Sequence, residues 1–158
     1  MADIRGAEPN PAVPAPRLKQ LVYASSAPRL LDQDELVDIL RASRKNNPVV
    51  GVTGALLYTG GNFMQVLEGP AEAVDGVYAR VKQDPRHRQV LTLLESEVDE
   101  RAFPEWSMGF LRPEDLPDED REATQSMLSL TEPQPGRVHR LLASFRSLMP
   151  GQQRYTSI

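Results

Sequence analysis

Apolar residues in the middle of the chain alternate or run together in five segments, which predicts five strands. Two of these segments flank Gly60-Gly61, a pair that supplies the positive φ angles of a tight hairpin turn. The third segment is expected to be central, because both of its faces are apolar apart from Gln65. The predicted strands cover residues 18–25, 49–59, 63–68, 89–98 and 106–110.

Two further segments follow a helical period. The first begins at Asp32, an N-cap for which Glu35 completes a capping box, and ends at Asn47, where a proline follows. The second lies between Gly69 and Asp84. The order strand-helix-strand-strand-helix-strand-strand predicts an α+β protein with a ferredoxin-like sandwich, in which a five-stranded mixed sheet carries two helices on one face.

The two ends of the chain differ in composition from this middle part. Residues 1–16 contain four prolines and few large apolar residues, so we expect a flexible leader. After the domain at 17–112, an acidic linker leads into C-terminal helices, and together they form an extension over 113–158. A modest helix is predicted at 119–131. A stronger one is predicted at 137–149, with an apolar stripe made of Val138, Leu141, Leu142, Phe145 and Leu148.

Composition removes several classes of function. The absence of cysteine excludes disulfides, thiolate nucleophiles and cysteine metal sites, and His87 and His139 lie in no metal-ligand spacing. The formal net charge of −4 argues against a direct nucleic-acid surface, which needs a basic patch. No apolar run reaches the ~20 residues of a membrane helix, and no secretory signal pattern begins the chain. We therefore expect a cytoplasmic protein without membrane contact.

Polar side chains within the predicted core point to a binding site. Gln65 lies in the central strand and Tyr23 in the first strand, and both need hydrogen-bond partners if they are buried. These strands are neighbours in a ferredoxin-like sheet, so the two side chains could meet under the helices. Ser43, Asn46 and Asn47 at the end of the first helix add groups that can hydrogen-bond the edge of a flat heterocycle.

Each of these residues also has an ordinary structural explanation when it is taken alone. An asparagine at the end of a helix is commonly a cap, and a glutamine in a strand commonly lies on an edge. Trp106 and Met108 in the fifth predicted strand are typical core residues. The residue types themselves leave these alternatives open.

Six motifs in a common order over about residues 17–112 resemble the BLUF family, the sensors of blue light using flavin. Their joint order and spacing make the resemblance specific. The motifs occupy residues 21–25 (Leu-Val-Tyr-Ala-Ser), 44–47 (Arg-Lys-Asn-Asn), 51–58 (Gly-Val-Thr-Gly-Ala-Leu-Leu-Tyr), 62–70 (Asn-Phe-Met-Gln-Val-Leu-Glu-Gly-Pro), 84–87 (Asp-Pro-Arg-His) and 103–110 (Phe-Pro-Glu-Trp-Ser-Met-Gly-Phe).

The resemblance implies a blue-light receptor that binds flavin non-covalently, with FAD expected and FMN as the alternative. It implies that Tyr23 is the photochemical electron donor and that Gln65 is the amide that switches its hydrogen bonds beside the flavin. Trp106 and Met108 would compete for the position next to this glutamine. The resemblance further implies flavin-binding roles for Ser43, Asn46, Asn47, Arg86 and His87, with Asn47 at the pyrimidine edge of the ring.

The resemblance also implies a short sensor without an effector domain and without enzymatic activity of its own. Proton-coupled electron transfer from Tyr23 and the switching of Gln65 would shift the fifth strand and the C-terminal helices. The signal would then pass to an unidentified downstream protein, or to a homo-oligomer formed through those helices. Two alternatives stay open: a small hydrolase on the same fold, and an interaction module that does not respond to light.

Overall fold

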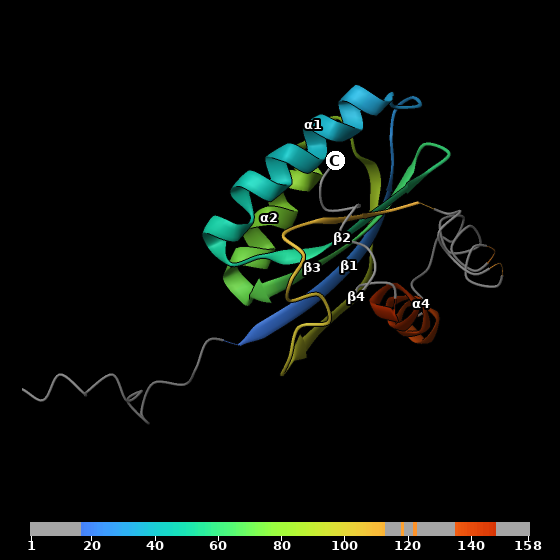
Figure 1. The fold of residues 1–158 in the computed structure, drawn as a ribbon. Coiled ribbons are helices and arrows are strands. Elements are labelled where there is room, and N and C mark those ends of the chain that lie inside the picture. Colours follow the sequence, from blue (N-terminus) through green and yellow to red (C-terminus); the bar gives the residue numbers. More distant parts are fainter. Residues whose placement is uncertain (1–16, 113–117, 119–121, 123–134, 148–158) are drawn as a thin grey trace, which may run out of the picture.

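The computed structural model describes residues 17–112, 118, 122 and 135–147, which form a five-stranded sheet with helices on both faces (Figure 1). The strands are β1 (Leu18–Ser26), β2 (Thr53–Thr59), β3 (Asn62–Pro70), β4 (Arg88–Val98) and β5 (Gly109–Leu111). The helices are α1 (Gln33–Asn46), the single 3-10 turn η1 (Pro48–Val50), α2 (Ala71–Gln83) and α4 (Pro135–Ser147).

The strands lie in the order β4-β1-β3-β2-β5, so β3 is central as predicted. β3 pairs antiparallel with both β1 and β2, whereas β5 pairs parallel with β2. The hairpin between β2 and β3 turns at Gly60 and Gly61, whose φ angles are 56° and 85°. The prediction of a mixed sheet in a ferredoxin-like arrangement is confirmed.

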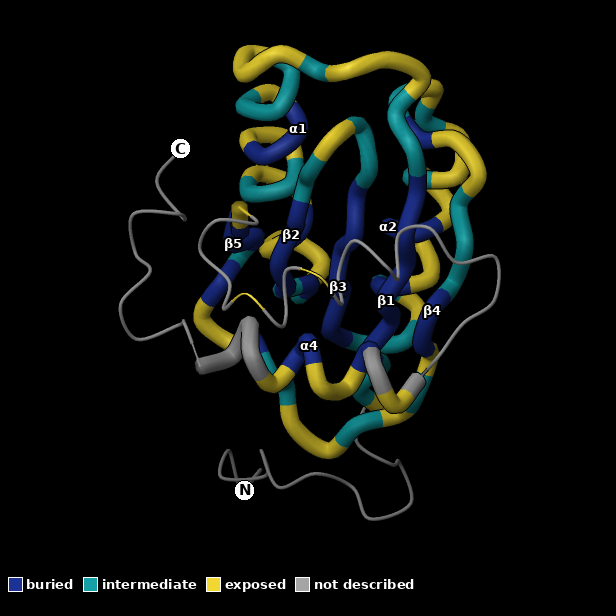
Figure 2. The backbone as a smooth tube through the Cα atoms, turned by 90° about the vertical axis from the view of Figure 1, so that its right-hand side faces the viewer, coloured by how far each residue is buried: buried dark blue, intermediate teal, exposed yellow. Residues whose placement is uncertain are grey.

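The two faces of the sheet carry separate apolar cores. α1 and α2 cover one face, and the first core between them and the sheet contains Tyr23 and Phe63. α4 lies across the opposite face (Figure 2), and the second core there contains Met64 and Trp106. Because side chains alternate along a strand, Gln65 shares the face of Phe63, under α1 and α2.

Local chemistry explains why α1 begins where it does. The side chain of Asp32 accepts a hydrogen bond from the backbone N–H of Glu35 at 2.8 Å, as in the predicted capping box. Acidic residues in the first turn and basic residues in the last turn complement the helix dipole. α1 buries Ile39 and Leu40 against the sheet, and this packing fixes the position of its C-terminal asparagines relative to the strands.

The second strand begins later than predicted. Residues 48–50 form η1, and β2 starts only at Thr53, so a strand from residue 49 is wrong at its start. The backbone N–H groups of Val50 and Val52 both donate to the carbonyl oxygen of Asn47, at 3.1 and 2.9 Å. This curl turns the side chain of Val49 outward, where it is 83% exposed.

The fifth strand is also shorter than the predicted 106–110. β5 covers only residues 109–111 and pairs with residues 55–57 of β2. Trp106 and Met108 lie in the preceding segment, and they point into different cores. The prediction that both residues lie in the fifth strand is wrong.

The C-terminal part of the structure confirms one predicted helix. α4 corresponds to the helix predicted at 137–149, and Val138, Leu141 and Leu142 of its stripe are buried on the sheet of the same chain. The side chains of Phe145 and Leu148 lie outside the described residues. So do the predicted leader at 1–16 and, apart from residues 118 and 122, the linker and the helix at 119–131.

Candidate functional site

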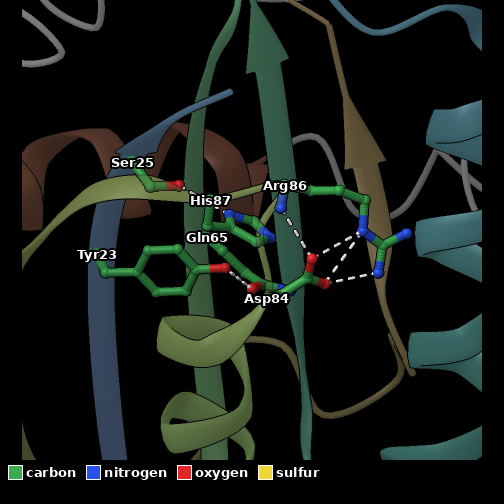
Figure 3. A network of polar contacts seen from close by, with 6 residues as sticks. All are labelled: Tyr23, Ser25, Gln65, Asp84, Arg86 and His87. Carbon is green, nitrogen blue, oxygen red and sulfur yellow. Dashed lines mark hydrogen bonds and ion pairs between the residues drawn. The ribbon is translucent and has the colours of Figure 1, made fainter. Parts of the chain in front are cut away.

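Tyr23 and Gln65 form a buried pair on the sheet face that α1 and α2 cover. The two residues are directly opposed in the register of β1 and β3, and the Tyr23 hydroxyl donates a hydrogen bond to Gln65 Oε1 (Figure 3). Tyr23 is completely buried, and burial raises the pKa of its phenol well above the usual value. The phenol therefore keeps its proton, and Gln65 Oε1 is the acceptor for that proton.

The other end of the Gln65 amide contacts Met108. Gln65 Nε2 donates to Met108 Sδ at 3.2 Å, and Met108 is fully buried in the first core. The carbonyl oxygen of Met108 accepts a hydrogen bond from Arg44 Nε of α1 at 2.8 Å. Both ends of the amide therefore meet side chains of this protein. A half-turn of the amide would exchange the donor and the acceptor that it presents to Tyr23 and Met108.

Trp106 lies on the opposite side of the sheet from Gln65. Its indole packs against Phe103, with 5.7 Å between ring centroids, in the core that includes α4. A Cβ atom added at Gly109 would lie 1.9 Å from Trp106 Cε3, so the missing side chain makes room for the indole. Met108, not Trp106, occupies the position beside Gln65 in this structure.

Asn47 provides a buried amide next to the end of α1. The residue is 4% exposed, and its backbone carbonyl accepts the two hydrogen bonds that shape η1. Within the described part of the chain, the side-chain amide of Asn47 has no hydrogen-bond partner, and it does not cap η1. A buried amide normally has partners. The orphaned donor and acceptor therefore fit the edge of a bound heterocycle. Ser43 is half-buried one turn earlier, and Asn46 is exposed.

His87 lies beside the same pair, just before β4. Its Nδ1 atom is 2.8 Å from Ser25 Oγ, and its ring centroid is 4.5 Å from that of Phe63 and 6.0 Å from that of Tyr23. Burial lowers the pKa of His87 to about 4, which the nearby Asp84 partly counteracts. The imidazole is therefore neutral at pH 7 and packs as a ring within the core.

Arg86 points away from this ring and pairs with Asp84 (Figure 3). Arg86 Nε and Nη2 donate to the Asp84 carboxylate over distances of 2.6–3.1 Å, which lowers the pKa of Asp84. The structure thus brings Tyr23, Gln65, Met108 and His87 together. It places Arg86 and Asn46 toward the outside and Trp106 on the far face.

Sequence reasoning missed two residues at the site, Arg44 and Asp84, and one buried residue on the opposite face of the sheet, Glu68. Arg44 holds the Met108 carbonyl, Asp84 holds Arg86, and Glu68 is a fully buried carboxylate in β3. Glu68 carried a signal, because an acidic residue within a strand with two apolar faces must find buried donors. Arg44 carried no such signal in the sequence, because its Nε donates to a backbone carbonyl oxygen 64 residues away.

Two features are absent among the residues that the structure describes: a metal-binding cluster and a membrane-spanning helix. No group of three or more His, Asp and Glu side chains among them could hold a metal ion. No helix among them is long and apolar enough to cross a bilayer.

Comparison with known proteins places this geometry in a family. A family model described as "Sensors of blue-light using FAD" matches residues 18–109, more than half of the chain. The chain belongs to the BLUF family. The predictions of a BLUF domain, of its α+β fold and of membership in a family of flavin-based blue-light sensors are confirmed. The roles of individual site residues stay predictions.

The relatives of this BLUF chain include much larger proteins. It is 36% identical over 132 residues to photoactivated adenylate cyclase subunit beta of Euglena longa, and 33% identical over 132 residues to subunit alpha of Euglena gracilis. These alignments cover 83% and 84% of this chain but only 14% and 12% of the relatives. The chain thus spans about one seventh of the length of these cyclase subunits.

Solved structures resemble the BLUF chain over most of its length. The dark-state structure of the BLUF protein BlrB matches with a TM-score of 0.71 and 34% identity, covering 84% of this chain and 98% of BlrB. The photo-activated state of BlsA matches with a TM-score of 0.69 and 26% identity, covering 82% of this chain and 94% of BlsA. A bacterial light-regulated adenylyl cyclase matches with a TM-score of 0.64 and 31% identity, covering 85% of this chain and 40% of the cyclase.

Proposed function

We propose that this chain is a blue-light receptor that binds FAD non-covalently on the sheet face covered by α1 and α2. The observation that carries the proposal is the buried Tyr23 hydroxyl hydrogen-bonded to the Gln65 amide. Apolar side chains could fill this core without needing hydrogen-bond partners. A phenol joined to a two-ended amide instead supplies an oxidisable group with a proton acceptor already in place.

We assign the pyrimidine edge of the flavin ring to Asn47, because its buried amide offers one acceptor and two donors without partners in the described structure. Ser43, one turn earlier in α1, would assist, and Asn46 would flank the ring from its exposed position. Arg86 and His87 are assigned to the ribityl-phosphate side. The pair with Asp84 uses Nε and Nη2 of Arg86, which leaves Nη1 for a ligand.

A bound flavin supplies blue-light absorption and, when excited, a strong one-electron acceptor. Tyr23 would be the residue that gives up one electron, and its phenol proton would pass to the Gln65 amide oxygen, the acceptor already hydrogen-bonded to it. Return of the electron and the proton would restore Tyr23, and Gln65 would be left with its donor and acceptor ends exchanged. The altered hydrogen bond beside the ring would appear as a modest red shift of the flavin absorption. Without cysteine, a thiol adduct is excluded.

The signal would leave the site through the segment that carries Trp106 and Met108. Met108 contacts the Gln65 amide and Trp106 contacts the core under α4, so this segment joins the two faces of the sheet. We propose that a downstream protein, or a second copy of this chain, responds to the change at the C-terminal helices. Three residues of the apolar stripe of α4 already pack on the chain's own sheet, so an oligomer would use other surfaces of the extension.

Absorption spectra before and after blue light test this function. Wild-type protein should be yellow and should show a reversible red shift. Tyr23→Phe and Gln65→Leu should bind flavin but lose the shift. Tyr78→Phe is the matched control, because its ring lies 5.2 Å from Tyr23 while its hydroxyl contacts Thr92 and not Gln65. This variant should keep the shift.

Each possible result of this experiment has a definite meaning. A normal red shift in Tyr23→Phe would remove Tyr23 as the electron donor. A flavin-loaded wild type without any shift would identify an interaction module that does not respond to light. Protein that binds no flavin and hydrolyses a model ester would favour a hydrolase.

The identity of the flavin can be tested on the released cofactor. The family description names FAD, while one BlrP1 structure of Klebsiella pneumoniae is described with FMN. Heat releases the flavin from the purified protein, and chromatography distinguishes FAD from FMN. We expect the released flavin to be FAD. The domain limits at 17–112, the absence of catalytic activity and the cytoplasmic location stay predictions from the sequence.

A further inference from the structure

Glu68 is a completely buried carboxylate that the proposed photochemistry does not use. It lies on the α4 side of β3, the face opposite to Gln65. Its Oε1 accepts the backbone N–H of Phe103 at 2.7 Å. Its Oε2 accepts the backbone N–H of Ala102 at 2.8 Å and Gln20 Nε2 at 2.9 Å. Three donors to two oxygens offset the cost of burying this group.

The two backbone donors belong to the start of the segment at 102–108. This segment lies outside any strand, so its N–H groups have no ladder partners, and one carboxylate binds two of them in succession. Arg101 strengthens the attachment, because its Nη1 donates to Thr53 Oγ1 at 2.9 Å and to the Glu68 carbonyl oxygen at 3.3 Å.

The other end of the same segment contacts Gln65 through Met108. β3 therefore holds the segment at both ends, from positions three residues apart and on opposite faces of the sheet. Trp106 lies between these ends, and its carbonyl oxygen accepts the backbone N–H of Gly54 at 2.9 Å. Trp106 is also the only tryptophan of the chain, which makes it a specific probe of the segment.

We propose that Glu68 is a positioning residue for the light response. By fixing residues 102 and 103, it provides a stationary end against which a change at Gln65 and Met108 displaces the indole of Trp106. Without this anchor, residues 102 and 103 would absorb part of the displacement of Met108, and the light-dependent change at Trp106 would be smaller. The proposal rests on the proposed function, because it requires that Gln65 changes its hydrogen bonds in light.

Glu68→Gln tests the proposal with almost no change in side-chain volume. The amide replaces one carboxylate oxygen by an NH₂ group, which cannot accept a backbone N–H, so one anchor is lost. We expect a normal flavin red shift, since Tyr23 and Gln65 are untouched. Acrylamide quenching of Trp106 emission should increase about twofold in darkness, and its light-minus-dark difference should fall by about half or more.

Two further variants separate positioning from general loss of stability. Gln20→Leu removes a donor to the same Oε2 from the β1 side and leaves both loop donors in place, so it should keep the light-dependent Trp106 signal. Ala102→Pro removes a loop donor while leaving Glu68 unchanged, so it should reproduce the effect of Glu68→Gln. If Glu68→Gln does not fold, Ala102→Pro provides the same test.

The outcomes also separate this inference from the function on which it rests. A wild type without a red shift would overturn the proposed function itself. A wild type with a red shift but no light-dependent change at Trp106 would overturn the role of Glu68. So would an unchanged Trp106 signal in a folded Glu68→Gln, or equal losses in Gln20→Leu and Glu68→Gln.

Discussion

Two adjacent asparagines at the end of α1 have opposite environments. Asn46 is exposed, while Asn47 is 4% exposed and its amide has no partner within the described structure. An unsatisfied buried amide costs roughly 1–3 kcal/mol, and a ligand that satisfies it recovers this free energy as affinity. The two residues therefore should contribute unequally to flavin binding, although they are neighbours of the same type.

Asn47→Ala should weaken flavin binding, while the matched variant Asn46→Ala should leave it nearly unchanged. We expect the flavin dissociation constant to rise about tenfold or more for Asn47→Ala, and to stay within about twofold for Asn46→Ala. Titration of apoprotein with flavin, followed by flavin fluorescence, measures both constants. A larger loss for Asn46→Ala would mean that the exposed residue turns inward to hold the ring.

His87 should make the stability of the folded protein depend on pH. Its folded-state pKa of about 4 lies below the ordinary value of 6.5, so between these values the unfolded chain binds a proton that the folded chain does not. Stability is therefore complete above about pH 6.5 and is lost as the pH falls toward 4. The contribution lost by pH 5 is about 2 kcal/mol.

Urea unfolding at pH 7.5 and pH 5 measures this dependence. The drop in the free energy of unfolding should be smaller by about 2 kcal/mol in His87→Gln than in wild type. His139→Gln is the control, because His139 is exposed on α4 and should leave the drop unchanged. An equal drop in wild type and His87→Gln would show that other groups cause the pH dependence.

At the scale of single residues, the sequence predicted a contact where the regular pairing of neighbouring strands determines it. Tyr23 and Gln65 could be paired in advance, because neighbouring strands bring opposed positions together. The residue pattern alone did not separate Asn46 from Asn47, because the turn of η1 decides which side chain faces inward, and only the family resemblance assigned Asn47 to the ring edge. Residue type alone also could not show that Arg44 would meet a distant backbone carbonyl.

At the scale of elements, the short β5 and the irregular segment before it explain the main error. In a strand, residues 106 and 108 would share a face, since side chains alternate. The segment instead follows the anchors at Glu68 and Arg44, so Trp106 enters the second core and Met108 the first. Side-chain-to-backbone bonds of this kind leave no periodic signal in the sequence.

Gly109 is the point at which β5 and the indole of Trp106 meet, and Gly109→Ala should disturb both. The added methyl group would lie 1.9 Å from Trp106 Cε3, so the ring must move. Overpacking of this kind costs typically about 1–3 kcal/mol of stability. Urea unfolding should show this loss, and Trp106 emission should shift as the indole leaves its present site.

Gly76→Ala is the matched control for this prediction. Gly76 lies inside α2, and nothing lies within 4 Å of the position that a Cβ would occupy. Because alanine favours the helix over glycine, this variant should be stabilised by up to about 1 kcal/mol. A Gly109→Ala protein as stable as wild type would mean that the indole has a second position of equal free energy.

At the scale of the whole molecule, the sheet separates two layers with different tasks. The proposed flavin site lies between the sheet and α1 and α2, while α4 covers the apolar face on the other side (Figures 1 and 2). The fold class was predictable because five strands and two helices alternate in a characteristic order. The position of α4 was not, because its stripe could have faced either this sheet or another molecule.

Removal of all residues after Arg112 should therefore affect the two layers differently. The truncated chain keeps both helices over the proposed flavin site, so it should keep its red shift. It loses the cover of the second core and exposes apolar side chains such as Leu57, Val66 and Leu94. Exposed apolar patches promote association, so we expect stronger binding of a hydrophobic dye and larger species in sedimentation.

Point substitutions in the full chain show whether this effect comes from α4 itself. Leu141 is 1% exposed against the sheet, while the neighbouring Arg140 is exposed. Leu141→Asp should place a charge in the second core and lift α4 from the sheet, so dye binding should rise as in the truncated chain. Arg140→Asp makes a larger change of charge at the surface and should not have this effect. If the truncated chain and Leu141→Asp both matched wild type in dye binding and size, the stripe of α4 would not cover the sheet in solution. The stripe would then be free to pack on a partner or on a second copy of this chain.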